Sequence, residues 1–140
     1  MSNAYTVLGF DFGTTKIGIA TGQTLTKTAT PYKIIKATDG LPNWEELEKI
    51  ITQWKPKHLV VGIPYEIDGG IGLMANRAQK FANRLKEKFQ LPVYTIDETG
   101  TTKLANSAID QNKAFFEKRH TNKNDSIAAA IILSEWLNTN

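Results

Sequence analysis

The amino-acid sequence predicts one α/β domain over residues 1–140, in which helices flank a mixed β-sheet. Three observations carry this prediction: an antiparallel strand pair near the N-terminus, a strand–helix–strand unit in the middle, and a strongly apolar last helix. A tight turn joins antiparallel strands, whereas a helical crossover joins parallel ones with a right-handed connection. A chain of this length buries roughly two-thirds of its unfolded surface, so the fold needs no disulfide or metal to hold it.

The opening stretch, residues 7–22, predicts a strand, a turn at Gly13-Thr14-Thr15 and a second strand. Because side chains alternate along a strand, Leu8 and Phe10 share one face and Asp11 falls on the other. Aspartate is depleted in strands and is costly to bury without a partner. Asp11 therefore either caps the turn that follows it or serves a site.

Three elements follow the opening stretch. A short strand over Thr30–Lys36 is expected at a sheet edge, because Pro31 cannot donate a ladder hydrogen bond. Asp39-Gly40 then marks a turn. A helix begins at Pro42, which suits a first helical turn, and Pro56 ends it.

The middle of the chain predicts the parallel part of the sheet. His58–Ile63 is apolar after its first residue, as in strands buried on both faces. A helix over Leu73–Phe89 leads to a strand over Val93–Ile96, so these two strands end at the same edge of the sheet. Asp97-Glu98 directly follows the second strand. Asp11 belongs to the same edge if its strand is a parallel neighbour.

The helix over Leu73–Phe89 carries basic residues at helical spacing, namely Arg77, Lys80, Arg84 and Lys88. Such a row is typical of a solvated face that keeps a protein soluble. It also suits a track for the phosphates of a nucleic acid. Both interpretations stay open at this point.

The last part of the chain predicts a weak helix, a basic loop and an apolar helix. Thr101–Asp110 has weak helical character, and Gln111–Asn124 is polar and basic and includes Lys123. Basic and aromatic residues alternate in that loop, which suits nucleic acid, although a plain connection explains the composition nearly as well. A helix from Asp125 to Leu137 is apolar on nearly all sides. Asp125 either caps that helix or joins Asp11 at the sheet edge.

Composition excludes several classes of protein. The chain has no cysteine, which excludes disulfides and thiolate metal sites. No apolar run approaches the roughly 20 residues that span a bilayer, and the N-terminus lacks a signal pattern, so we expect a cytoplasmic protein without a membrane partner. The net charge of +3 permits a polyanionic partner without demanding one.

The acids of the chain converge in this arrangement. Asp11, Asp97 or Glu98, and Asp125 all fall at one edge of the sheet, and like charges that close raise one another's pKa unless a cation intervenes. Mg²⁺ and Mn²⁺ prefer oxygen ligands, and two such ions roughly 4 Å apart clamp the attacking and leaving oxygens of a phosphodiester hydrolysis. The residues therefore predict a nuclease that uses Mg²⁺ or Mn²⁺, with two ions at the site.

At this point the sequence resembles the YqgF (RuvX) family of Holliday-junction-resolvase-like nucleases over nearly its whole length. The resemblance rests on five motifs in order: Gly9–Thr14, Val61–Pro64 with Asp68-Gly69, Arg77–Leu85, Asp97-Glu98 followed by Thr101-Thr102, and Lys123–Ser126. It implies a ribonuclease H-like fold with a five-stranded mixed sheet, three antiparallel strands plus two parallel ones. It also implies that Asp11, Glu98 and Asp125 are the catalytic, metal-binding acids, with Thr14 and Asp97 in support.

The phosphate contacts expected from the resemblance are basic. Lys16 and Lys123 match basic positions of the family and join the helix residues Arg77, Lys80 and Arg84 as phosphate-binding candidates. The family usually carries arginine after its two acids, whereas this chain has Thr99. That difference affects the expected affinity for substrate rather than for metal.

The expected function is a metal-dependent endonuclease on structured RNA that processes the 5′ end of the small-subunit (16S) ribosomal RNA precursor, with ribosomal precursor particles as partners. The alternatives are a Holliday junction resolvase acting on DNA and a non-catalytic nucleic-acid or ribosome-binding module. Asp11–Thr15 also looks like the phosphate loop of actin-like sugar kinases, but those phosphotransferases need two such domains. Either a monomer or a homodimer is expected, and resolution of a two-fold junction needs the dimer.

Overall fold

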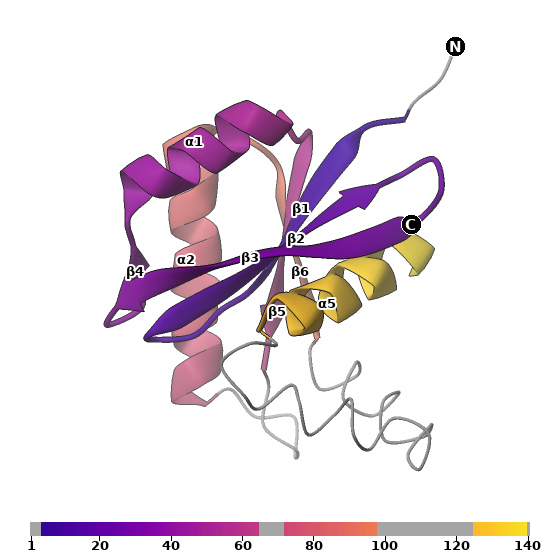
Figure 1. The fold of residues 1–140 in the computed structure, drawn as a ribbon. Helices are drawn as coiled ribbons and strands as arrows, with labels where there is room; N and C mark the ends of the chain where they lie inside the picture. The colour runs from indigo at the N-terminus through magenta and orange to yellow at the C-terminus, as the bar shows by residue number, and fades with distance from the viewer. Residues whose placement is uncertain (1–3, 65–71, 98–124, 140) are drawn as a thin grey trace.

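A computed structural model describes residues 4–64, 72–97 and 125–139. The strands form one sheet in the order β4-β3-β2-β1-β5-β6 (Figure 1). The strands are β1 (Thr6–Asp11), β2 (Lys16–Gln23), β3 (Thr28–Thr38), β4 (Leu41–Pro42), β5 (His58–Ile63) and β6 (Val93–Asp97). The helices are α1 (Trp44–Trp54), α2 (Leu73–Phe89) and α5 (Asp125–Thr139).

The sheet is mixed, as the sequence predicts. β1, β2 and β3 are antiparallel neighbours, and Asp11 pairs with Gly18 across the first turn. β5 runs parallel to β1, and β6 runs parallel to β5. β1, β5 and β6 therefore finish at the same edge, which makes that edge the place to look for a site.

The expected count of five strands is wrong, because the structure has a sixth. β4 is a two-residue strand that pairs with Ala37 and Thr38 of β3. The turn between them has Asp39 at φ 51° and Gly40 at φ 81°. Positive φ at both central residues gives a tight hairpin turn, which folds the chain back into a further strand.

The same hairpin shifts the start of the first helix. Pro42 belongs to β4, not to the first helical turn as expected, and α1 begins at Trp44. Asn43 caps the helix, because its side-chain oxygen accepts hydrogen bonds from the backbone N–H groups of Glu45 and Glu46. At the other end the backbone N–H of Lys55, at φ 47°, donates to the carbonyl of Ile51. Pro56 follows, as expected.

The sheet separates two apolar cores (Figure 1). α1 and α2 cover one face, where Leu8 and Phe10 of β1 pack with Phe81 of α2. α5 covers the other face, where Val7 packs with Leu133. The alternation predicted for the first strand is thus confirmed, and each face of β1 has its own helical cover.

Within residues 4–64, 72–97 and 125–139, no helix is long and apolar enough to cross a membrane. The helix expected over Thr101–Asp110 and the basic loop expected over Gln111–Asn124 lie outside the described residues. β3 is longer than the expected Thr30–Lys36, because its first residues also pair with β2.

Candidate functional site at the carboxyl edge of the sheet

Asp11 is the last residue of β1 and lies at the carboxyl edge of the sheet. The residue is half-buried. Two residues earlier, Gly9 lies directly beneath Leu133 of α5, so strand alternation puts Asp11 on the α5 face. A carboxylate of a half-buried residue at the end of a central strand is suited to binding a cation.

Asp97 shares this edge but falls on the other face. It pairs with Ile63 at the end of β5, and its side chain is exposed. In β6, Tyr94 contacts Trp136 of α5, whereas Val93 packs into the core under α2. By alternation Asp97 falls on the α2 face, opposite Asp11. Glu98 lies outside the described residues.

Glycines in three strands let α5 lie very close to the sheet. A β-carbon at Gly9 would lie 2.7 Å from Leu133 Cβ, and one at Gly22 would lie 2.7 Å from Leu133 Cδ2. At Gly62 of β5 a β-carbon would lie 2.6 Å from Ile132 Cδ1. Real side chains do not approach this closely, so the glycines fix the height of α5 above β1, β2 and β5.

The direction of α5 brings its first turn toward Asp11. The carbonyl of Ala129 lies over Gly9, and Leu137 lies over Gly22, which is level with Val7 at the start of β1. α5 therefore runs antiparallel to β1. Asp125 precedes Ala129 by about 6 Å along the helix, and Asp11 follows Gly9 by about 7 Å along the strand. The backbone at Asp125 is therefore level with the carboxyl end of β1.

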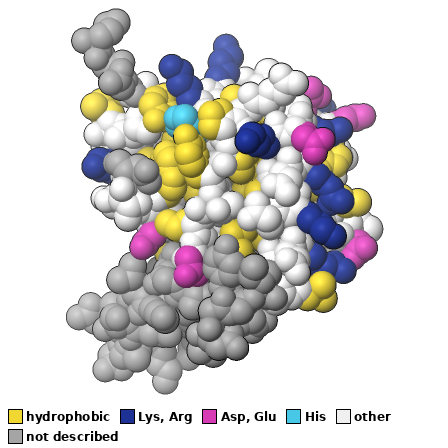
Figure 2. All heavy atoms as spheres, turned by 180° about the vertical axis from the view of Figure 1, so that it is seen from behind, with side chains coloured by type: hydrophobic (Ala, Val, Ile, Leu, Met, Phe, Trp, Pro, Cys, Tyr) yellow, Lys and Arg dark blue, Asp and Glu magenta, His cyan; other side chains and the backbone are white. Residues whose placement is uncertain are grey.

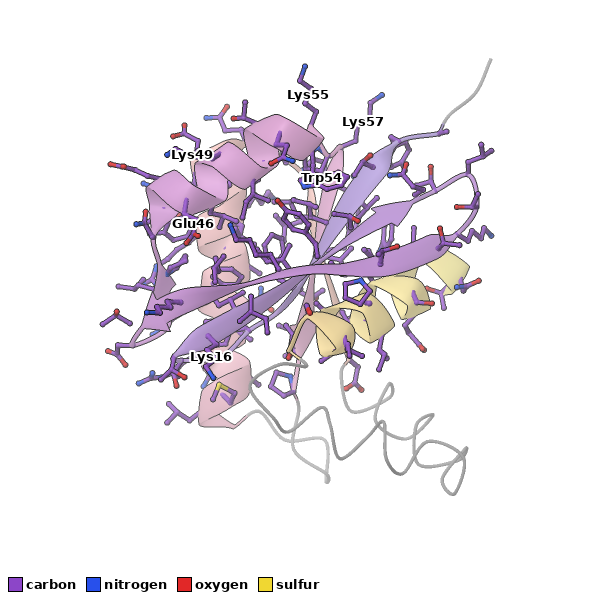
Figure 3. All side chains as sticks on the ribbon, viewed as in Figure 1. Lys16, Glu46, Lys49, Trp54, Lys55 and Lys57 are labelled. Carbon is purple, nitrogen blue, oxygen red and sulfur yellow. The ribbon has the colours of Figure 1, made fainter. Side chains whose placement is uncertain are left out.

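Thr14 lies in the turn that follows Asp11, and Lys16 begins β2 directly after that turn. The backbone N–H of Gly40 donates to the carbonyl of Thr14 at 2.9 Å, which ties this turn to the β3–β4 hairpin. A β-carbon at Gly13 would lie 2.5 Å from the carbonyl oxygen of Lys16, so the turn requires glycine there. Lys16 is half-buried and lies at the end of the molecule where β5 finishes (Figure 3).

The basic residues predicted on the second helix come together around a hollow. Arg77, Lys80 and Arg84 of α2 line a hollow of about 170 Å³ with Phe12, Asp39 and Gly40. The Nη1 atom of Arg77 lies 2.9 Å from Oδ1 of Asp39. Lys and Arg side chains form a column on the rear side of the molecule, where α2 lies (Figure 2). Lys88 is separate, with its ammonium 5.5 Å from the centre of the Trp44 ring.

The acid set expected for metal binding is only partly described. Among residues 4–64, 72–97 and 125–139, no three histidine or acidic side chains group closely enough to hold a metal ion. Glu98 and Lys123 lie outside those residues. What the structure contributes is the position of Asp11 and the backbone at Asp125, while Asp97 lies on the other face.

His58 lies at the opposite end of β5 from the carboxyl edge. Its ring contacts those of Tyr5, Tyr94 and Trp136, with centroid distances of 4.9, 5.3 and 6.0 Å. Burial of the ring, with a smaller contribution from the charge of Lys57, lowers the pKa of His58 below its ordinary value. Hydrophobic side chains gather around a histidine in Figure 2. His58 is the first residue of β5, so it lies at the end of the strand away from the carboxyl edge.

Sequence reasoning missed the pairing of Asp39 with Arg77. Asp39 was interpreted only as a turn residue, and Arg77 lies 38 positions further along the chain. No periodicity links residues that far apart, since only the packing of α2 beside the β3–β4 hairpin brings them together. The aromatic cluster around His58 was missed for the same reason.

Comparison with known proteins finds relatives of this chain over nearly its whole length. The model of the family described as "RuvX: Holliday junction resolvase" matches residues 5–139. A Haemophilus ducreyi protein named "Putative pre-16S rRNA nuclease" is 46% identical over 137 residues, covering 98% of this chain and 99% of that protein. A Pseudomonas putida protein of the same name is 41% identical over 140 residues, covering 100% and 99%.

Solved structures share the fold at low sequence identity. Thermus thermophilus RuvC in complex with a Holliday junction substrate matches with a TM-score of 0.57 at 14% identity, covering 96% of this chain and 94% of that one. The yeast mitochondrial Holliday junction resolvase Ydc2 matches with a TM-score of 0.54 at 12% identity, covering 94% and 77%. At these identities the likeness shows the ribonuclease H-like fold alone.

Proposed function

Because the chain belongs to the RuvX family, we propose that it is a nuclease that hydrolyses phosphodiester bonds in the precursor of 16S ribosomal RNA. The observation that carries this proposal is the near-complete, 41–46% identical match to relatives named for that activity. The carboxyl edge of the sheet supports it, because Asp11 ends β1 there and the start of α5 is level with that end. The protein would act in the cytoplasm on structured RNA and on ribosomal precursor particles.

The catalytic acids in this proposal are Asp11, Glu98 and Asp125, which would hold Mg²⁺ or Mn²⁺, with two ions per site. Carboxylate oxygens are the ligands that these hard cations prefer, so the donor chemistry fits. The chain has no cysteine, and His58 lies at the far end of β5. When bound, the ions would polarise the scissile phosphate and lower the pKa of a coordinated water. The half-buried setting of Asp11 would hold its carboxylate in place.

The nucleic acid in this proposal is held by Lys16, Arg77, Lys80, Arg84 and Lys123. Thr14 would support the site through the turn that follows Asp11, because its carbonyl is fixed by Gly40. Asp97, on the opposite face, would act on the electrostatics of the edge rather than as a ligand. Thr99 replaces a guanidinium that would contact phosphate, so we expect weaker substrate binding than in relatives with arginine there.

Two other functions keep specific support. Resolution of DNA junctions is favoured by the description of the family and requires a homodimer, because two symmetric cuts need two sites. A non-catalytic nucleic-acid or ribosome-binding module is favoured by Thr99, which departs from the usual sequence of the site. The actin-like phosphotransferase hypothesis has no such support, since the family match covers residues 5–139.

The test compares cleavage by the wild type and by Asp11→Asn. The substrates are a 16S precursor fragment with its 5′ extension and a four-way DNA junction, each with Mg²⁺, with Mn²⁺ and with EDTA. We expect metal-dependent cleavage of the RNA. Asp11→Asn should lower the cleavage rate by at least about a hundredfold, because the loss of a metal ligand weakens the stabilisation of charge in the transition state. Glu46→Gln, a change on α1, is the matched control.

Unfolding in urea shows whether Asp11→Asn keeps the stability of the wild type. Undiminished cleavage by a folded Asp11→Asn variant would remove Asp11 from the mechanism. Binding of RNA without cleavage in either metal would favour the binding module. Cleavage of the junction alone, by a protein whose solution mass is that of a dimer, would favour the resolvase.

A further inference from the structure

The hollow beside α2 is a concentrated site of positive charge. Arg77, Lys80 and Arg84 occupy successive turns on one side of the helix, and Phe12 and Gly40 form the opposite wall. Seven residues of helix span about 10 Å, so the row offers cations along a line rather than at one point. The volume of about 170 Å³ has room for a phosphate group with ordered water.

The hollow and the Asp11 side chain lie on opposite faces of the sheet at β1. Phe12 lines the hollow and packs into the core under α2, whereas Asp11, one residue earlier, falls on the α5 face. A phosphate in the hollow is therefore separated from the Asp11 carboxylate by the thickness of the sheet. It cannot be the scissile phosphate, so it belongs to a flanking part of the same nucleic acid.

Asp39 is the one acidic side chain among the described residues that line the hollow. Its Oδ1 atom lies 2.9 Å from Nη1 of Arg77, while its own side chain is 80% exposed. A surface ion pair of this kind contributes little to stability. It does occupy one edge of the Arg77 guanidinium, the group in the hollow best suited to bidentate binding of a phosphate.

We propose that this hollow binds a backbone phosphate of the arm that flanks the cleavage site, and that Asp39 limits the affinity by competing for Arg77. The inference rests on the proposed function, because it takes nucleic acid as the ligand. Lys80 and Arg84 extend the contact along α2, and Asp39 swings away from Arg77 when the phosphate arrives. Asp39 is thus an affinity-determining residue, although it does not touch the reacting atoms.

The test measures binding of a fluorescein-labelled RNA hairpin with single-stranded flanks, by anisotropy in EDTA so that cleavage does not interfere. Asp39→Asn is expected to bind about two- to fivefold more tightly than the wild type, the range that corresponds to losing an exposed ion-pair competitor. Asparagine is chosen because residue 39 has φ 51°, which asparagine tolerates well. Glu46→Gln is the matched control, since Glu46 of α1 (Figure 3) pairs with Lys33 of β3 at 3.6 Å and is not among the residues that line the hollow.

Arg77→Gln supplies the second arm of the test. It should weaken binding and lower the slope of log K against log salt by about one unit, because one phosphate contact is lost. In the Arg77→Gln background, Asp39→Asn should then have a smaller effect than in the wild type. Equal affinities of the wild type and Asp39→Asn, or an equal gain from Glu46→Gln, would overturn the inference.

The binding and cleavage assays distinguish failure of this inference from failure of the proposed function. If the wild type cleaves RNA through Asp11 but Asp39→Asn binds no more tightly, the function stands and the inference about the hollow fails. If Asp39→Asn binds RNA more tightly while no variant cleaves it, phosphate binding in the hollow and the competition by Asp39 stand, and the nuclease assignment fails.

Discussion

Replacing Gly9 by alanine should push α5 away from the sheet. The new β-carbon would lie 2.7 Å from Leu133 Cβ and 3.2 Å from the carbonyl oxygen of Ala129. Ordinary carbon contacts lie at about 3.5–4.0 Å, so the two elements must separate by about 1 Å. Neither atom lies at the end of a flexible side chain, so no rotamer change relieves the overlap.

The size of the effect follows from two opposing terms. Overpacking a core costs about 1–3 kcal/mol of unfolding free energy, whereas replacing glycine by alanine stabilises by about 0.4–1 kcal/mol through the unfolded chain. Gly9→Ala should therefore lower the unfolding free energy by about 1–2 kcal/mol. Cleavage should fall further, by up to about a hundredfold, because the first turn of α5 moves relative to Asp11.

Gly22 provides the matched comparison. A β-carbon there would lie 2.7 Å from Leu133 Cδ2, and the nearest other atoms also belong to the outer parts of Leu133 and Leu137. Leu133→Ala removes the two Leu133 atoms but keeps Cβ, and it leaves Leu137 Cδ1 at 3.0 Å. It should therefore relieve the overlap in Gly22→Ala by about 1 kcal/mol or more and leave most of the overlap in Gly9→Ala.

Urea unfolding of the wild type, the three single variants and the two double variants measures these free energies. Leu133→Ala alone costs about 2–5 kcal/mol, so all samples contain the same stabilising osmolyte. An unfolding free energy for Gly9→Ala within about 0.5 kcal/mol of the wild type would refute the reasoning. Equal rescue by Leu133→Ala at positions 9 and 22 would refute it as well.

Two further predictions concern parts of the fold away from the edge. Asn43→Ala should lower the unfolding free energy by about 0.5–2 kcal/mol in urea, because Glu45 and Glu46 lose the side-chain oxygen that caps α1, and an unchanged midpoint would contradict this role. Burial and the charge of Lys57 lower the pKa of His58 in the folded protein below its ordinary value of 6.5. As the pH falls through 6.5, the unfolded state therefore binds more protons than the folded state, and the unfolding free energy should decrease. His58→Phe retains an aromatic ring against Tyr5, Tyr94 and Trp136 and should remove that part of the pH dependence between about pH 7.5 and pH 5.5. A slope of unfolding free energy against pH identical to that of the wild type would exclude His58 as its source.

Local patterns in the sequence were sufficient for most of the fold. The alternation in β1, the apolar run of β5 and the helical spacing in α2 each reflect interactions within a few residues, and the structure confirms all three. The sixth strand was not predicted, because it depends on the backbone of Asp39 and Gly40 at positive φ. An Asp-Gly pair permits that conformation, but it also suits many other turns.

For the candidate site, too, the sequence and the tertiary structure supply different information. The sequence by itself predicted the candidate residues for the chemistry: acids at the ends of strands and a basic row on α2. Only the tertiary structure decided which of these lie on the same face. It put Asp11 beneath α5, Asp97 on the α2 face and Asp39 against Arg77. Strand alternation is local, but the face that a helix covers depends on long-range packing, which no short stretch of sequence encodes.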